Sequence, residues 1–180
     1  SRLYAVKPDL MCIAKALTNG YYPMGATMIS EGVAEAFENN HDAFGNIGHG
    51  YTYSAHPVGA AAALAALEET ERLKVADNAK ARGQEMIAAC RDLKARHEIV
   101  GDVRGQGLMI CLELVSDRAA KTPAAKETVN TVFETTYQAG VMVRVSGHNV
   151  ILSPPLIVSA ADVARIVTAL DAGLAAAKPA

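Results

Sequence analysis

The sequence predicts a mixed α/β protein built from two parts that differ in their order of elements. Up to about residue 72, short apolar runs are joined by polar and glycine-rich segments, whereas the remainder reads as helix, strand, strand, helix, strand, strand, helix. The second series is typical of a small α+β layer, in which antiparallel strands lie under helices. We therefore predict domains at residues 1–73 and 74–180. The first part has too few strands to close a core alone.

Composition limits the class of protein. The 180 residues are 51% hydrophobic with a formal net charge of -2, which indicates a soluble globular chain and not a nucleic-acid binder. No run approaches the roughly 18 to 20 apolar residues of a membrane span. The opening SRLYAVKPDL has neither the apolar core of a signal peptide nor an initiating Met, so we expect the chain to begin in mid-protein.

The three cysteines are widely separated, and each lies in or beside an apolar segment: Cys12, Cys90 and Cys111. None has the close pairing of a zinc or redox motif. We expect reduced core residues in a cytoplasmic protein.

In the first part, the apolar run at residues 10–14 predicts a buried strand that ends near Lys15. Residues 26–29 form a second apolar run, and Ser30 is positioned to cap a short helix after it. The segment ENNHDAFGNIGHGYTYSAHPVG has no sustained period and predicts a long loop, of a kind that is often functional. Pro57 suits the first turn of the alanine-rich helix that follows.

In the second part, a helix is predicted at residues 75–96, then strands at 99–103 and 108–115 with a turn built on Gly105 and Gly107. Thr122 and Pro123 are predicted to open a helix that Gly140 ends. Strands at residues 141–146 and 149–153 follow. A capping box of Ser159 and Asp162 begins the last helix.

Lys15 is the first candidate for chemistry. A lysine at a strand end usually buries its stem and leaves the ammonium in water. Alternatively, the apolar neighbours in CIAKAL would desolvate the amine, lower its pKa and leave it reactive toward a carbonyl. Gly20 and Gly25 in the following loop permit close approach of a bound molecule.

The segment GHGYTYSAHP lies directly before a predicted helix and carries Thr52 and Ser54. Free peptide N–H groups at a helix N-terminus favour an anion, so the segment is either a phosphate cradle or a capped turn. His49 and His56 are seven residues apart with no third ligand nearby, so structural hydrogen bonds are favoured over a metal site.

Arg144 lies in VMVRVS, where the valines share one face and Met142 and Arg144 the other. It is either an exposed strand arginine or a guanidinium that binds a carboxylate through a bidentate fork.

Three segments, PDLMCIAKALTNGYYPMGA, HGYTYSAHPVGAAAALAALE, and GDVRGQGLMICLELV followed by VMVRVSGHNVILSPPLIVS, together resemble the C-terminal part of a class III, omega-type aminotransferase of subgroup II. The resemblance covers nearly the whole chain. It implies a pyridoxal-phosphate enzyme of fold type I, with residues 1–73 as the end of the large cofactor-binding domain and residues 74–180 as the small C-terminal domain. SPPLIVS resembles the strand that closes the small domain.

The resemblance also implies residue roles. Lys15 matches the catalytic lysine that forms a Schiff base with pyridoxal 5'-phosphate, and Thr52 with the backbone of Tyr51 matches the phosphate-binding position, shared across a homodimer interface. Arg144 matches the mobile arginine that pairs with a substrate carboxylate. The aspartate, stacking aromatic residue and glycine-serine loop that complete such a site precede the lysine segment in the family and are not in this chain.

The implied function is ping-pong transfer of an amino group from an amine or omega-amino acid to pyruvate or a similar oxo acid, with no nucleic-acid or membrane partner. The alternatives are another class III enzyme, such as an aminomutase or an ornithine-type transaminase, and a non-catalytic fragment that docks on a partner chain. We expect catalysis only with the missing N-terminal portion present, possibly as a separate chain. The amine donor, its handedness, and dimer versus tetramer stay open.

Overall fold

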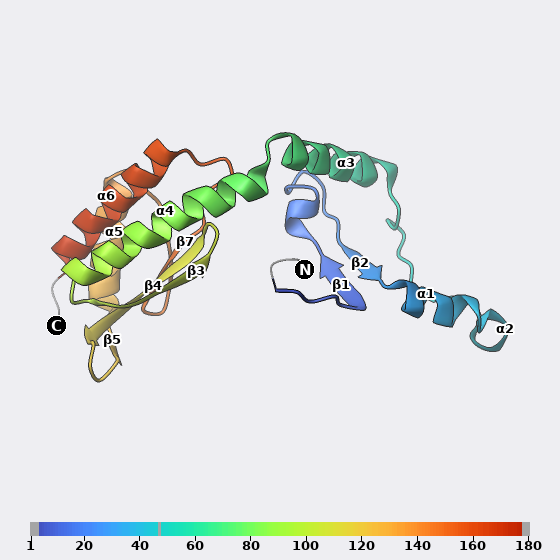
Figure 1. Cartoon of the computed structure of the whole chain (residues 1–180), viewed down its shortest axis with the longest axis horizontal. Coiled ribbons are helices and arrows are strands. Elements are labelled where there is room, and N and C mark those ends of the chain that lie inside the picture. Colours follow the sequence, from blue (N-terminus) through green and yellow to red (C-terminus); the bar gives the residue numbers. More distant parts are fainter. Residues whose placement is uncertain (1–3, 47, 178–180) are drawn as a thin grey trace. The chain divides into compact units, whose positions relative to one another are not determined.

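The computed structural model describes residues 4–46 and 48–177; Ile47 of the predicted loop and the two ends of the chain lie outside them. The chain divides into two compact units, Ser1–Arg72 (unit 1) and Leu73–Ala180 (unit 2), and each is described by itself (Figure 1).

Unit 1 contains a two-stranded antiparallel sheet. Strand β1 (Leu10–Ile13) pairs with β2 (Ala26–Ile29), with Leu10 opposite Ile29 and Ile13 opposite Ala26. Both strands lie where the apolar runs predicted them. The burial expected for β1 is wrong: Leu10 is 59% exposed and Cys12 is exposed, because no layer of described residues covers this sheet.

Three α-helices lie in the described part of unit 1. Helix α1 (Glu31–Glu38) begins after Ser30, but the Ser30 hydroxyl donates to Asp9 Oδ1 at 2.9 Å and does not cap the helix, so that prediction is wrong. A short helix α2 (His41–Phe44) lies inside the segment predicted as continuous loop. Helix α3 (Pro57–Arg72) begins at the predicted proline.

Unit 2 is a sheet covered on one face by helices α4 (Val75–Arg96), α5 (Lys126–Gln138) and α6 (Ala160–Ala176), as Figure 1 shows. Strands β3 (Val100–Gln106), β4 (Met109–Asp117), β7 (Asn149–Leu152) and β6 (Arg144–Ser146) pair antiparallel in that order. The core is apolar and comes from both layers, including Met86, Leu93, Val132 and Leu170 of the helices and Leu112, Val150 and Leu152 of the strands. The predicted α+β layer is confirmed.

Several boundaries in unit 2 differ from the prediction; the strand predicted at residues 141–146 is found only as β6, which begins at Arg144. Thr122 and Pro123 form strand β5 (Thr122–Pro123) on the edge of β4, and α5 begins three residues later. A proline is tolerated at a sheet edge, where its missing N–H is not needed. Gly105 lies within β3 and not in the turn. A Cβ there would meet Met109 O at 2.3 Å, so the close approach of β4 requires glycine.

Both predicted helix ends in unit 2 are confirmed. At the end of α5, Gly140 has φ +84°, its N–H donates to Tyr137 O, and the Val141 N–H donates to Thr136 O, which is a Schellman motif. At the start of α6, Ser159 and Asp162 bond to each other's backbone N–H in a capping box.

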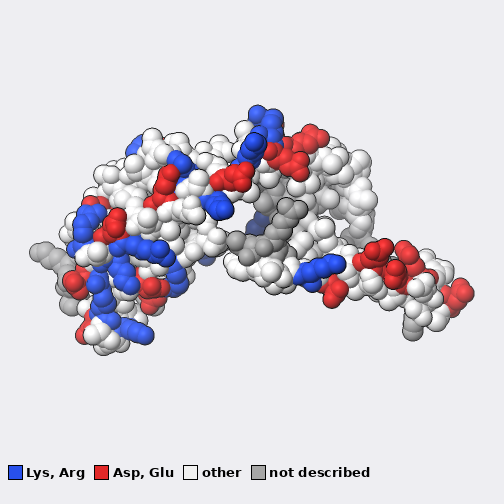
Figure 2. Space-filling view, viewed as in Figure 1, with Lys and Arg blue, Asp and Glu red and all other residues white. Residues whose placement is uncertain are grey.

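Acidic and basic side chains are interleaved over unit 2 on the face drawn in Figure 2. Several are paired, including Arg96 with Asp171 and Arg104 with Glu113, each at 2.7 Å. None of the described helices is both long and apolar enough to cross a membrane.

Candidate active site

Lys15 stands after β1, separated from it by Ala14, as the first residue of a short 3-10 helix (Lys15–Leu17). Its backbone φ is +53°, in the left-handed region that side chains other than glycine rarely adopt. Such strain costs about 1 to 3 kcal/mol and is concentrated at functional sites. The turn therefore holds the lysine in an orientation that an ordinary strand end would not give.

The apolar surroundings expected around Lys15 are not found. Lys15 and its neighbours Ala14 and Ala16 are exposed, and no described residue pairs with the Lys15 side chain. The reason is the uncovered β1–β2 sheet, which leaves the end of β1 open. The Lys15 amine is accessible from outside the chain.

The loop after Lys15 is fastened by Thr18. Thr18 is 1% exposed, its N–H donates to Lys15 O at 3.3 Å, and its hydroxyl donates to Tyr22 O at 2.6 Å. Gly20, at φ +81°, lets the chain turn back between Thr18 and Tyr22. Thr18 therefore ties the lysine turn to Tyr22.

Tyr22 in turn packs on the beginning of α3. Its ring stacks on His56, with centroids 5.4 Å apart and planes at 22°. A Cβ at the buried Gly59 would lie 2.8 Å from two Tyr22 ring atoms, so glycine is needed for the contact. The structure thus brings the lysine loop against the segment that follows Tyr51 and Thr52.

Tyr51 and Thr52 belong to a closed turn. The Tyr51 N–H donates to the Ser54 hydroxyl at 2.9 Å, and the Ser54 N–H donates to Tyr51 O at 2.9 Å. This is the capped turn that the sequence left open as one alternative. The Thr52 N–H and hydroxyl, in contrast, have no partner among the described residues, so they are available to an anion ahead of α3.

The two histidines of this segment make aromatic contacts and not the expected hydrogen bonds. His49 lies edge-on to Tyr51 with centroids 5.2 Å apart, and His56 is stacked on Tyr22. The His56 Nδ1 atom is buried and has no hydrogen-bond partner in the described part of the chain.

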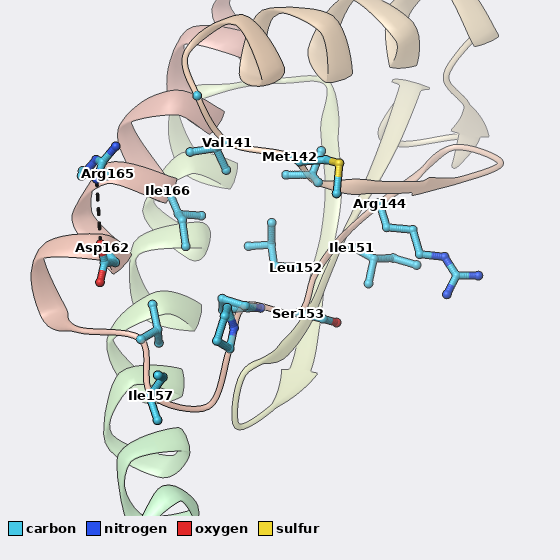
Figure 3. Close-up of a pocket in the computed structure, with 15 residues that line it drawn as sticks. Val141, Met142, Arg144, Ile151, Leu152, Ser153, Ile157, Asp162, Arg165 and Ile166 are labelled. Atoms are coloured by element: carbon cyan, nitrogen blue, oxygen red, sulfur yellow. Dashed lines mark ion pairs between the residues drawn. The ribbon is translucent and has the colours of Figure 1, made fainter. Parts of the chain in front are cut away.

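Arg144 belongs to unit 2, at the start of β6. Val143 is 6% exposed and Met142 is 78% exposed, so the predicted alternation of faces is confirmed. Arg144 lies opposite Ile151 on the sheet face turned away from the helices, and it has no ion pair with any described residue. Figure 3 shows its guanidinium extending away from the apolar side chains that line the adjoining groove.

A second arginine, Arg104, lies on the same sheet face, and sequence reasoning missed it. Its guanidinium donates to Asp102 at 3.1 Å and to Glu113 at 2.7 Å. The pKa of Arg104 is raised, chiefly by Glu113, and Arg104 holds the pKa of Asp102 below its ordinary value. The alternation of polar residues along β3 and β4 could have indicated from the sequence that Arg104 lies on this face. Because Arg104 is neutralised by carboxylates, Arg144 is the unpaired arginine of this face among the described residues.

A groove of about 820 Å³ adjoins Arg144 between the end of α5, strands β6 and β7, and α6 (Figure 3). Its lining includes Val141, Leu152, Pro155, Ile157 and Ile166. The segment SPPLIVS borders it as an irregular connection and not as the expected strand, because Pro154 and Pro155 have no N–H to donate to a sheet.

Comparison with known proteins places the chain in a family. Residues 2–174 match the pattern of the family described as aminotransferase class-III. The chain is 36% identical over 173 residues to gamma-aminobutyrate transaminase 1, mitochondrial, of Oryza sativa subsp. indica, covering 93% of this chain and 33% of that protein. It is 35% identical over 179 residues to the taurine–pyruvate aminotransferase of Bilophila wadsworthia, covering 93% of this chain and 39% of that protein.

A solved structure shows the same fold. The chain superimposes on an amine transaminase from an uncultivated Pseudomonas species, crystallised in its PLP-bound form, with a TM-score of 0.91 and 39% identity over 99% of this chain and 40% of that one. The fold is therefore part of fold type I of the PLP-dependent transferases, as the sequence predicted. The chain spans less than half the length of these relatives. Its sequence pattern and its fold agree, and the chain belongs to the class-III aminotransferase family.

Proposed function

We propose that the protein containing this chain is a pyridoxal-phosphate-dependent transaminase that moves an amino group from an amine or omega-amino acid to pyruvate or a similar oxo acid. The observation that carries the proposal is the accessible Lys15, set on a strained turn that Thr18 and Tyr22 fasten to the start of α3. Family membership and the names of the relatives support the reaction class and the acceptor.

The residues present fit the cofactor in two respects. Lys15 offers an amine with no partner among the described residues, and Thr52 offers an unpaired N–H and hydroxyl before a helix N-terminus, where a phosphate is favoured. We therefore propose that Lys15, Tyr51 and Thr52 hold pyridoxal 5'-phosphate. When bound, the cofactor supplies a carbonyl electrophile and a ring that delocalises negative charge.

Lys15 has two tasks under this proposal. Its Nζ atom would hold the cofactor, and when it is not attached the same atom would accept and return a proton. The Lys15 side chain is exposed at the end of β1, and the turn held by Thr18 limits the directions that Nζ can take.

Arg144 is proposed to select the acceptor. An unpaired guanidinium can bind an oxo-acid carboxylate through two parallel hydrogen bonds, and its exposed position lets it swing away when the substrate has no carboxylate. The name of the taurine–pyruvate relative supports pyruvate as the acceptor.

We further propose residues 1–73 as the end of a large cofactor-binding domain and residues 74–180 as the small domain, in a cytoplasmic homodimer or larger assembly. In that assembly Thr52 serves the partner's cofactor. Exposed apolar side chains on α3, including Val58, Leu64 and Leu67, support an interface there. The rest of the site would come from the part of the protein outside this chain.

The test uses the full protein that contains this chain, with added pyridoxal phosphate. We expect a visible absorption band and transfer of an amino group to pyruvate from at least one amine or omega-amino acid. Lys15→Ala should lose both, while Lys7→Ala, a change of the same kind at the other end of β1, should keep both. A protein that is folded but gains no band would refute the proposal.

A further inference from the structure

His56 lies at the centre of a small aromatic cluster at the start of α3. Tyr22 stacks on its ring at 5.4 Å, and Tyr53 contacts it at 5.8 Å with the planes tilted by 47°. Tyr22 belongs to the lysine loop, whereas Tyr53 belongs to the turn that carries Thr52. One imidazole therefore touches both segments that the proposed function uses.

The Tyr22 side of the cluster is rigidly connected to Lys15. The buried Thr18 bonds through its hydroxyl to Tyr22 O and through its N–H to Lys15 O. A Cβ at Gly59 would lie 2.8 Å from two Tyr22 ring atoms, so the Tyr22 ring also lies close against α3. Tyr22 therefore contacts both the lysine turn and the helix.

On the other side of the cluster, Tyr53 is directly connected to Thr52. Tyr53 is the neighbour of Thr52, and the His56 N–H donates to Tyr53 O at 3.3 Å. Ala55, between them and His56, has φ +55°, so this short connection is itself held in an uncommon backbone conformation. A change in the position of the His56 ring would therefore shift the backbone at Thr52.

The imidazole acts here through its faces and not through its nitrogen. Nδ1 is buried without a partner among the described residues, although a buried polar atom normally has one. A phenyl ring at position 56 would keep the stack on Tyr22 and would give up no hydrogen bond that the structure shows.

We propose that His56 is a positioning residue for the cofactor site: its stack on Tyr22 and its tilted contact with Tyr53 set the lysine turn and the Thr52 turn relative to each other. The inference rests on the proposed function, in which both turns bind the cofactor. In the proposed dimer, where Thr52 serves the partner's cofactor, the same stack would couple the geometry of the two sites.

The experiment compares the unaltered full protein with His56→Ala, His56→Phe and the control Tyr137→Ala. Tyr137 also forms a stacked pair, with Phe133 on α5 at 6.0 Å, and belongs to unit 2. We measure the dissociation constant of pyridoxal phosphate by absorbance titration. We also measure backbone hydrogen exchange of the cofactor-free protein in peptides covering residues 15–22 and 51–56.

We expect His56→Ala to weaken cofactor binding about 3- to 10-fold, the scale of its lost stack on Tyr22, and to speed exchange in both peptides. His56→Phe and Tyr137→Ala should stay close to the unaltered protein in both measurements. A merely structural role would speed exchange along the whole of α3 and leave the two turns no different from the rest.

Two results would overturn the inference. One is unchanged cofactor affinity and unchanged exchange in His56→Ala; the other is a loss in His56→Phe as large as in His56→Ala, which would assign the effect to the ring nitrogen. If the unaltered protein binds no pyridoxal phosphate, the proposed function and the inference both fail. If it binds the cofactor and the variants do not differ, the inference fails alone.

Discussion

Replacing Arg144 by alanine should separate the two half-reactions of the proposed enzyme. Arg144 is exposed and has no ion pair in the described chain, so its removal should change the stability of the fold by no more than about 0.5 kcal/mol. Its proposed contact with an oxo-acid carboxylate is a charge-assisted hydrogen bond worth about 1.5 to 3 kcal/mol. At about 1.4 kcal/mol per tenfold change, kcat/KM for pyruvate should fall about 10- to 140-fold.

The assay measures the two half-reactions separately by single-turnover absorbance, with pyruvate in one and a carboxylate-free amine in the other. The amine half-reaction should be unchanged, because that substrate offers nothing for the guanidinium to bind. Arg144→Lys should lie between the two proteins, since it keeps the charge but loses the bidentate fork.

A matched control is available in the same unit. Arg165 also borders the groove beside Arg144, but it lies 4.0 Å from Asp162 and is largely exposed. Arg165→Ala should leave both half-reactions unchanged. Equal losses with pyruvate and with the amine in Arg144→Ala, or the same pyruvate defect in Arg165→Ala, would refute the assigned role.

Two further changes test the phosphate position and the stability of unit 2. Thr52→Val keeps the size of the side chain and removes the hydroxyl. It should weaken pyridoxal phosphate binding about 10-fold, because one hydrogen bond to a charged group is lost. An unchanged dissociation constant would exclude Thr52 from the site. Asp171 has its pKa lowered, first by Arg96 and then by His97, so its contribution to stability is present above its unfolded pKa of about 3.9 and is lost as pH falls through the lower folded value. Asp171→Asn should therefore melt at a lower temperature than the unaltered protein at pH 7, and the difference should shrink in acid; a constant difference would contradict the linkage.

The sequence was a good guide where one residue type has one local consequence. Gly140 ends α5 and Ser159 begins α6 as predicted, because a left-handed cap needs glycine and a capping box needs a hydroxyl and a carboxylate three residues apart. The periodic apolar residues correctly predicted the core of unit 2, because that unit buries its apolar faces within itself.

The sequence was a poor guide where a residue has two competing partners. Ser30 had a helix to cap and Asp9 to bond, and the strand contact won because β1 and β2 bring Asp9 and Ser30 together. Lys15 was expected in apolar surroundings from its neighbours along the chain, but burial depends on the layer above the sheet, which no local pattern reveals. The Tyr22–His56 stack was missed because it joins residues 34 positions apart.

The central claim is that Lys15 holds the cofactor, and one measurement tests it directly. The full protein, loaded with pyridoxal phosphate, is reduced with borohydride, digested and analysed by peptide mass spectrometry. The proposed function predicts a stable pyridoxyl group on Lys15 in the peptide that follows β1, with Lys7 and Lys74 unmodified. A pyridoxyl group on another lysine, or a reduced and folded protein that carries none, would contradict it.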